Sequence, residues 1–266
     1  MTIGVFDSGV GGLTVLRALR RELPGRDFIY LGDTARLPYG TKSAASVLRY
    51  AEQAADALVA HGLSCLVIAC NTASAVALEA LRRRHAPLPV VGVIGPGAQA
   101  AVAASASGRI AVIATEGTVR SGAYEAAIRR LRPQAEVAAA ACPLFVALAE
   151  EGWTEGEVVD LAIRRYLDPV LSVAAPPDVL LLGCTHFPVL AAAIGRVAGP
   201  RITIVDSAAT TAAVVRSELR DVVGASQGCG SMRLLATDDA ARFARVGAGF
   251  LGEAITAGAV EVVDLG

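Results

Sequence analysis

The chain has 266 residues, enough for one large domain or two smaller ones with a hydrophobic core. Apolar residues make up 54% and charged residues 18%, which excludes an intrinsically disordered chain. The net charge is −1, so the chain has no excess of positive charge to attract the phosphates of a nucleic acid, and we expect no nucleic-acid partner.

Short apolar runs alternate with longer amphipathic segments along the chain. Most of the runs are continuous, which is typical of strands buried on both faces of a parallel sheet. The predicted strands cover residues 3–6, 28–32, 65–69, 90–94, 110–114, 137–141, 179–183 and 202–205. Helices are predicted over 43–61, 72–84, 121–132 and 155–171. This rhythm predicts right-handed crossovers and a doubly wound α/β fold.

The chain also contains an internal repeat. Residues 66–72 resemble residues 180–186, because each stretch is an apolar strand that ends in a cysteine, Cys70 or Cys184. Residues 3–9 resemble residues 110–116 at a similar spacing. We therefore expect two pseudo-symmetric domains, each a doubly wound parallel sheet. Their predicted extents are 1–94 plus 207–266 for the first, discontinuous domain and 95–206 for the second.

Polar and nucleophilic side chains directly follow the strands of both repeats. They are Asp7, Ser8, Cys70, Asn71, Cys184, Thr185 and His186. Ligands of open α/β sheets bind at the carboxyl ends of the strands, so we expect an active site in a cleft between the two domains. A histidine two residues after a candidate catalytic cysteine is a candidate acid/base partner.

The chain has five cysteines and no C-x-x-C pair, which favours neither a disulfide framework nor a zinc ribbon. Cys65, Cys142 and Cys229 are interpreted as structural. A helix that starts directly after Cys70 or Cys184 would lower the pKa of the thiol. The first residues lack the features of a signal peptide, and the longest uncharged stretch, 86–108, is broken by prolines and glycines. We expect a cytoplasmic protein without a membrane segment.

The glycine-rich turn after the first strand does not fit a nucleotide-binding motif. Thr14 stands where a dinucleotide-binding fingerprint needs its third glycine, and Lys42 does not follow a glycine directly, as a P-loop requires. The turn instead favours close approach of a small anion to backbone N–H groups. Asp7, a carboxylate at a strand end, needs a partner there.

Several of these segments together resemble the glutamate racemases of the aspartate/glutamate racemase family. The matching stretches are residues 6–15, 32–40, 70–74 and 183–188, with weaker similarity at 115–119 and 142–146. The resemblance implies two racemase-type domains that enclose the substrate. It also implies an isomerase that converts L-glutamate to D-glutamate for peptidoglycan synthesis, needs no cofactor or metal, and forms a homodimer.

The resemblance also assigns residues. Cys70 would take the α-proton from D-glutamate and Cys184 from L-glutamate, with Asp7 and His186 assisting the nearer cysteine. The substrate-binding residues that it implies are Asp7, Ser8, Tyr39, Gly40, Asn71, Thr72, Thr118, Glu150, Thr185 and His186.

The chemistry of inversion agrees with two cysteines. A single base would return the proton to the face it came from, so inversion at the α-carbon needs one base on each side. A pyridoxal-dependent racemase would need a Schiff-base lysine, and Lys42 is the only lysine, in no recognisable pyridoxal site.

Three alternatives stay open at this level. The same scaffold could serve aspartate or another acidic amino acid. Cys70, Cys184 and His186 are residue types that zinc prefers, although their spacing is unusual for a metal hydrolase. A two-domain module that binds an amino acid without catalysis is the third alternative.

Overall fold

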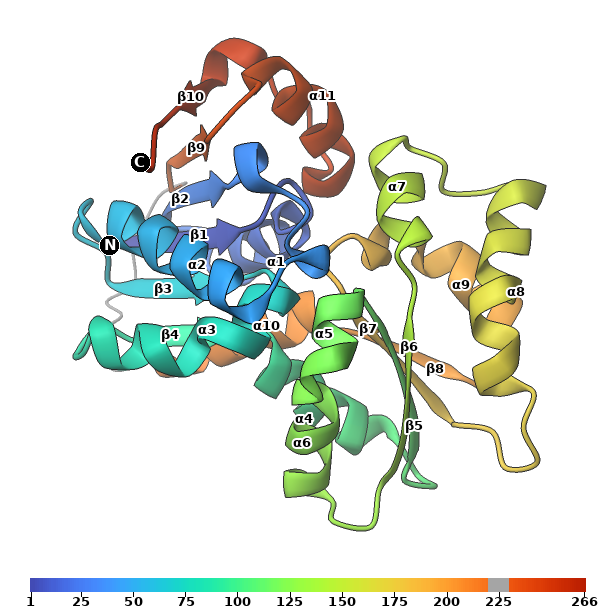
Figure 1. Cartoon of the computed structure of the whole chain (residues 1–266). Helices are drawn as coiled ribbons and strands as arrows, with labels where there is room; N and C mark the ends of the chain where they lie inside the picture. The colour runs from blue at the N-terminus through green and yellow to red at the C-terminus, as the bar shows by residue number, and fades with distance from the viewer. Residues whose placement is uncertain (220–229) are drawn as a thin grey trace.

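The computed structural model describes residues 1–219 and 230–266, which form two separate parallel sheets (Figure 1). The first sheet consists of β1 (Thr2–Asp7), β2 (Asp27–Gly32), β3 (Cys65–Ile68), β4 (Val90–Gly92), β9 (Met232–Ala236) and β10 (Val260–Val262). Its strand order is β10-β9-β2-β1-β3-β4. The second sheet consists of β5 (Arg109–Ala114), β6 (Glu136–Ala141), β7 (Val179–Gly183) and β8 (Thr203–Asp206), in the order β6-β5-β7-β8.

Helices cover both faces of the first sheet. One face packs against α2 (Ala44–Val59) and α3 (Asn71–Arg84) through a buried apolar cluster. The other face packs against α1 (Leu13–Glu22), α10 (Ser207–Glu218) and α11 (Ala240–Leu251). Because both faces are covered, β1 and β2 are buried along almost their whole length, which explains their continuous apolar sequences. Short 3-10 helices are η1 (Thr34–Arg36), η2 (Tyr39–Thr41) and η5 (Ala257–Ala259).

The second sheet is covered in the same way. One face packs against α4 (Ile94–Ala104) and α6 (Ala123–Leu131), and the other against α8 (Glu157–Leu171) and α9 (Ala191–Ala198). Side chains alternate along β5, so that Ile110 and Val112 belong to the first of these clusters and Ala111 and Ile113 to the second. The remaining elements are α5 (Glu116–Ser121), α7 (Leu144–Glu150) and η3 (Phe187–Leu190).

The structure confirms the eight predicted strands and the internal repeat. The order β2-β1-β3-β4 in the first sheet is repeated as β6-β5-β7-β8 in the second, so the two cysteine-bearing strands, β3 and β7, occupy equivalent positions. The fourth strand is shorter than predicted, because residue 94 already begins α4. The helix predicted over 121–132 is divided by Gly122, whose φ of +64° ends α5 and precedes α6.

Two strands of the first sheet were not predicted. β9 and β10 lie beyond β2 at one edge, after the chain has returned from the second sheet. The two crossings between the sheets are followed by α4 and α10, and these helices pack against each other. The exact domain limits, 1–94 plus 207–266 and 95–206, stay a prediction. No helix in the part of the chain that the structure describes is long and apolar enough to cross a membrane.

Candidate functional site

The carboxyl ends of the two sheets meet, and side chains from both form a common buried site. Thr185, after β7, donates from Oγ1 to Oδ1 of Asp7, at the end of β1, over 3.4 Å. Thr14 of α1 donates to the main-chain oxygen of Thr185 over 3.1 Å. Gly11 leaves no room for a side chain, because a Cβ there would lie 2.4 Å from Nδ1 of His186. The two halves of the predicted site are therefore in contact.

Cys70 lies at the start of α3 and caps that helix. Its Sγ accepts a bond from Ala73 N over 3.4 Å and lies 3.4 Å from Oγ of Ser8. Burial raises the pKa of the Cys70 thiol, and the charge of Asp7 raises it further, to about 12. The bonds from Ser8 and Ala73 act in the opposite direction but are outweighed. The helix start thus lowers this pKa as expected, but the net pKa is raised, because burial and a nearby carboxylate exceed the helix effect.

Cys184 lies at the equivalent position of the second sheet, and it is as buried as Cys70, each being 5% exposed. The predicted helix does not begin directly after it: a turn through Thr185 and His186 comes first, and then η3. Sγ of Cys184 lies 3.9 Å from Nδ1 of His186. Its polar partner is thus an imidazole rather than a helix N-terminus.

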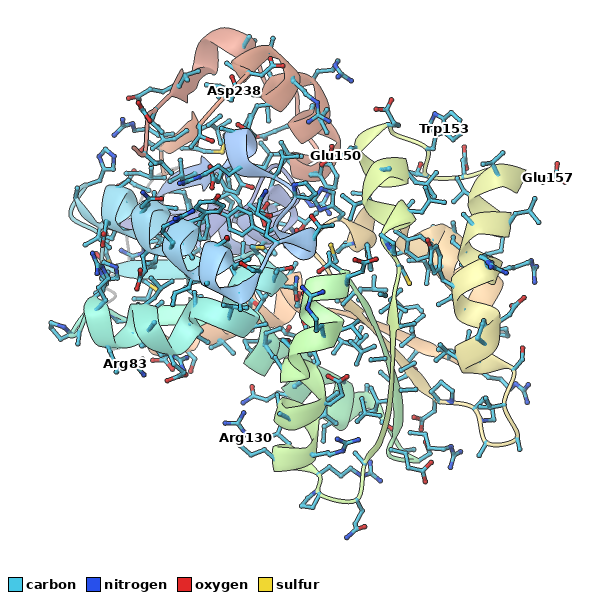
Figure 2. The ribbon with its side chains drawn as sticks, viewed as in Figure 1. Arg83, Arg130, Glu150, Trp153, Glu157 and Asp238 are labelled. Atoms are coloured by element: carbon cyan, nitrogen blue, oxygen red, sulfur yellow. The ribbon has the colours of Figure 1, made fainter. Side chains whose placement is uncertain are left out.

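His186 is held from its other side by Glu150, at the end of α7. Nε2 of His186 lies 3.1 Å from Oε1 of Glu150, and Oε2 of Glu150 accepts a 2.7 Å bond from Arg242 of α11. Figure 2 shows Glu150 between α7 and α11. Burial alone lowers the pKa of His186, but Cys184, Glu150 and Asp7 together raise it to about 10. Burial alone raises the pKa of Glu150, but His186 and Arg242 lower it to about 2. A cationic imidazole therefore faces Cys184 at neutral pH.

Asp7 is fully buried beneath the glycine-rich turn. Gly9 N donates to its Oδ2 over 2.9 Å, so the turn supplies Asp7 with a partner, while the predicted approach of a small anion stays a prediction. Burial raises the pKa of Asp7, although the positive charge of His186 and bonds from Gly12, Gly9 and Thr185 oppose this. Asp7 influences both thiol environments, because its charge acts on Cys70 and on His186.

Asn71 presents an unused pair of hydrogen-bond donors. Its Oδ1 accepts a 2.6 Å bond from the hydroxyl of Tyr124, which belongs to α6 of the second unit. Its Nδ2 is buried and has no partner among the described residues. A buried amide donor without a partner is costly, so this group is suited to an anionic ligand such as a carboxylate.

Three threonine hydroxyls meet where α3 approaches α5. Oγ1 of Thr72 lies 2.9 Å from Oγ1 of Thr115 and 3.1 Å from Oγ1 of Thr118. Thr72 and Thr118 were predicted to bind substrate, and Thr115, which caps α5, joins them. Each hydroxyl can donate or accept, so the cluster can turn its protons toward a bound anion.

The side chain of Tyr39 is engaged with a buried carboxylate. Its hydroxyl donates to Oδ2 of the buried Asp33, which also accepts from Arg36 and Thr237. The side chain of Tyr39 therefore holds η2 against the buried Asp33. Gly40 does reach the site region, because a Cβ there would lie 2.7 Å from Cβ of Thr115.

The structure thus brings Asp7, Ser8, Cys70, Thr185, His186, Glu150 and Cys184 into one connected set of contacts, with Asn71, Thr72 and Thr118 on the adjoining start of α3 and on α5. Three side chains that contact them were not predicted: Arg242, Tyr124 and Thr115. Arg242 and Tyr124 lie in the first turns of amphipathic helices, and no local sequence pattern marks them as site residues. Thr115 had one, as a polar residue directly after a strand. Cys65 and Cys142 are free and buried, as expected of structural cysteines, and Cys229 lies outside the described residues.

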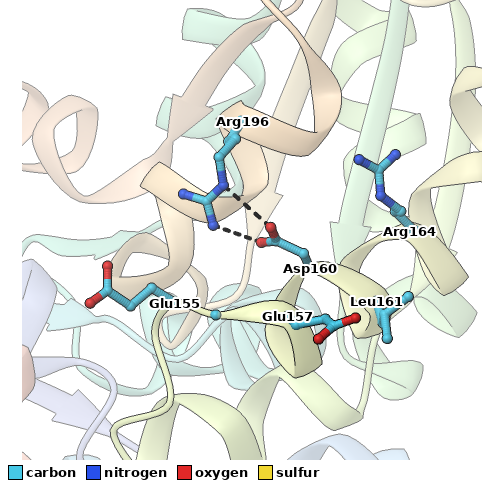
Figure 3. Close-up of a pocket in the computed structure, with 7 residues that line it drawn as sticks. Glu155, Glu157, Asp160, Leu161, Arg164 and Arg196 are labelled. Carbon is cyan, nitrogen blue, oxygen red and sulfur yellow. Dashed lines mark hydrogen bonds and ion pairs between the residues drawn. The ribbon is translucent and has the colours of Figure 1, made fainter.

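Two surface cavities lie away from these residues. One, of about 650 Å³, is lined by α8 and Arg196 of α9, and Arg196 pairs with Asp160 there (Figure 3). The other, of about 350 Å³, lies among arginines of α1 and the end of α11. Within residues 1–219 and 230–266, no three histidine, cysteine or acidic side chains are grouped as metal ligands would be. The set Cys70, Cys184 and His186 therefore has no metal-ligand geometry there.

Comparison with known proteins shows similarity to racemases along most of the chain. The family model described as Asp/Glu/Hydantoin racemase matches residues 3–215. A glutamate racemase of Geobacter metallireducens is 51% identical over 252 residues, which cover 94% of this chain and 92% of the relative.

Solved structures agree with this in fold. The glutamate racemase of Francisella tularensis in complex with D-glutamate superposes with a TM-score of 0.91 at 34% identity, over 99% of this chain and 97% of that one. The glutamate racemase of Thermus thermophilus in complex with beta-chloro-D-alanine has a TM-score of 0.87 at 43% identity and the same coverage. With two equivalent sheets, a thiol at the end of each, and this likeness along its full length, the chain belongs to the Asp/Glu/Hydantoin racemase family.

Proposed function

We propose that the chain interconverts L-glutamate and D-glutamate without a cofactor, with Cys70 and Cys184 as the two bases. The observation that carries this proposal is the placement of the two thiols. Each follows an equivalent strand of its own sheet, and contacts between Asp7, Thr185 and His186 hold the two strand ends together. Inversion needs one proton acceptor on each face of the α-carbon, and the pseudo-symmetry supplies one thiol from each side.

The two thiols have different polar neighbours. Sγ of Cys184 lies 3.9 Å from Nδ1 of His186, which is placed to assist it. Cys70 faces Asp7, and its raised pKa keeps the proton on sulfur. With L-glutamate, the Cys184 thiolate takes the α-proton, and the electron pair stays on the α-carbon. The Cys70 thiol then delivers its proton to the opposite face, which gives D-glutamate, a Cys184 thiol and a Cys70 thiolate.

The return reaction uses the same groups with their roles exchanged. The Cys70 thiolate takes the proton of D-glutamate, and the Cys184 thiol delivers one to the other face. The buried surroundings strengthen every electrostatic contact with the carbanion, because little water screens them. The donors of Asn71 and Thr72 are suited to hold the α-carboxylate while its negative charge increases, and Thr185 belongs to the same proposed substrate site.

Glutamate is the proposed substrate because the similar proteins are named glutamate racemases and two of them share this fold over almost the whole chain. Ser8, Tyr39, Gly40, Thr118 and Glu150 complete the proposed substrate site, Tyr39 through its main chain.

Incubation with L-glutamate in D₂O tests the reaction. Protein freed of metal and pyridoxal should abolish the optical rotation of the solution while deuterium enters the α-carbon. Intact rotation and an undiminished α-proton NMR signal with folded, reduced protein would reject glutamate as substrate. The same assay with aspartate then tests the closest alternative.

Replacing either thiol tests the mechanism. Cys70→Ala and Cys184→Ala should each abolish racemisation and leave the fold intact, because each removes one of two indispensable bases. Cys65→Ala is the matched control, since Cys65 is a free, buried thiol outside the contact set. Full activity in either active-site variant would exclude the two-base mechanism.

The wider role is part of the proposal. By the family resemblance, the enzyme supplies D-glutamate for peptidoglycan, acts in the cytoplasm and forms a homodimer. Its two domains comprise residues 1–94 plus 207–266 and residues 95–206. Sedimentation of the purified protein tests the homodimer.

A further inference from the structure

We propose that Arg242 is a positioning residue for the Cys184 half of the reaction: it reaches from the first unit to hold Glu150, which holds His186 against Cys184. The inference rests on the two-cysteine reaction proposed above. It adds a residue that touches neither thiol and lies far along the chain from both.

The contacts form one row of four side chains. Arg242 Nη2 donates to Oε2 of Glu150 over 2.7 Å, and Oε1 of the same carboxylate faces Nε2 of His186 at 3.1 Å. Nδ1 of His186 lies 3.9 Å from Sγ of Cys184. Each carboxylate oxygen serves a different cation, so Glu150 is fixed in orientation by both.

The row is balanced in charge when Cys184 is a thiolate. Arginine and imidazolium are then matched by carboxylate and thiolate. Without the guanidinium, the row would carry one net negative charge, which disfavours the thiolate that must form to accept a proton. Asp7 also faces His186, and Phe250 packs its ring edge-on to the imidazole at 5.0 Å. Cys70 has its hydrogen bonds with Ser8 and Ala73, and none among the described residues joins it to the row.

The position of Arg242 is unfavourable for a cation on its own helix. It lies in the first turn of α11, where the helix dipole repels positive charge. The cap residue Asp239 has φ +46°, the single non-glycine residue with positive φ within residues 1–219 and 230–266. Glu150 supplies the compensation that explains a cation at this place.

The segment before α11 is also hydrogen-bonded to the segment that follows β2 in the first unit. Thr34 donates to the main-chain oxygen of Asp238 over 2.7 Å, and Thr237 donates to Asp33 over 2.9 Å. Asp33 in turn accepts from Tyr39 of η2. α11 packs against α1 and β10 of the first sheet, and α7 packs against α8 of the second. The Arg242–Glu150 pair therefore joins the two units directly beside the reacting groups.

Deuterium isotope effects test the proposal. Both enantiomers of glutamate have the same free energy, so any variant must lose kcat/KM equally in the two directions. Values of kcat/KM alone therefore do not reveal which of the two proton transfers has become slower. The isotope effect on kcat/KM reveals it. With L-glutamate deuterated at the α-carbon, it reports proton removal by Cys184, and with deuterated D-glutamate, removal by Cys70.

Arg242→Gln should lower kcat/KM about tenfold. Its isotope effect should rise with L-glutamate and fall with D-glutamate, because the Cys184 step becomes the slower one. Arg242→Lys, which keeps the charge, should lie between wild type and Arg242→Gln, and it serves as the test if Arg242→Gln does not fold. Arg245→Gln removes an exposed cation from the same helix and should leave activity and both isotope effects unchanged.

Wild-type activity in Arg242→Gln would overturn the proposal. So would a loss of activity with both isotope effects unchanged, which would mean a merely structural role. Failure of the wild type to racemise glutamate would instead reject the proposed function, so the two failures are distinguishable.

Discussion

Gly11 and His186 are in direct contact across the two units: a Cβ at Gly11 would lie 2.4 Å from Nδ1 of His186 and 2.5 Å from Oγ1 of Thr185. Real Cβ atoms do not approach other atoms so closely. The glycine-rich turn therefore has a packing function in addition to its backbone donor at Gly9. It lets the first unit close onto the imidazole beside Cys184.

Gly11→Ala should displace His186 or separate the two strand ends. We expect kcat/KM for glutamate to fall by about a hundredfold or more, since misplacement of a catalytic group by about 1 Å costs this much. Steady-state kinetics and a thermal melt measure the effect. Gly249→Ala is the control, because none of the described residues lies within 4 Å of a Cβ there, and it should keep full activity. Equal activity in the two variants would contradict the close packing.

The His186–Glu150 pair should make stability depend on pH in the alkaline range. The pKa of His186 is raised from 6.5 to about 10, so folding takes up a proton between these values. The free energy of unfolding should therefore be highest below pH 6.5 and fall toward pH 10, by up to ~1.4 kcal/mol per pH unit. Urea unfolding at a series of pH values measures this.

Glu150→Gln should flatten that dependence, because it removes one of the groups that raise the pKa of His186. His61→Gln, at an exposed histidine, should leave it as in the wild type. A slope that persists unchanged in Glu150→Gln would show that the carboxylate does not hold the proton on His186.

Tyr124→Phe should weaken substrate binding. The Tyr124 hydroxyl holds Oδ1 of Asn71, which leaves Nδ2 directed to a ligand, and without it the amide is free to rotate. We expect KM to rise about tenfold with little change in kcat, since this contact would serve substrate and transition state alike. Tyr166→Phe removes a tyrosine hydroxyl that bonds to none of the described residues, and its KM should equal that of the wild type. An unchanged KM in Tyr124→Phe would separate Asn71 from substrate binding.

Lys42→Arg should retain full racemase activity. Pyridoxal enzymes attach their cofactor through a lysine, and this chain has a single one. The side chain of Lys42 is partly exposed, and its main-chain oxygen, which accepts from Arg120, is unaffected by the change. Activity assays of the pyridoxal-free variant measure the outcome. If Lys42→Arg lost activity and the addition of pyridoxal phosphate changed the activity that remained, the cofactor-free reaction would be refuted.

The sheet of the second unit and most of the first could be predicted from the sequence. Most of the eight predicted strands are continuous apolar runs, because helices cover both faces of each sheet. β9 and β10 escaped prediction. β10 is only three residues long with two exposed side chains, and both strands add to an edge that earlier segments create.

The residues of the candidate site also fall into two groups, those that the sequence identified and those that it did not. Cys70, Cys184, Asp7 and His186 each follow an apolar strand, so local sequence and the internal repeat were sufficient to identify them. Arg242 and Tyr124 belong to amphipathic helices. The helical pattern of the sequence does not indicate that these two side chains contact Glu150 and Asn71, which come from distant segments. They enter the site only because the second sheet is inserted before α11 and folds against the first.

What the sequence determined by itself was the repeated α/β framework and the place of one cysteine at the same point in each repeat, because apolar period and strand ends are local properties. The tertiary structure decided which charged groups surround the two thiols. Burial and Asp7 raise the pKa of Cys70, while His186, held by Glu150, places a positive charge beside Cys184. Electrostatic environment depends on every group within a few ångströms, and those groups come from segments far apart in the chain.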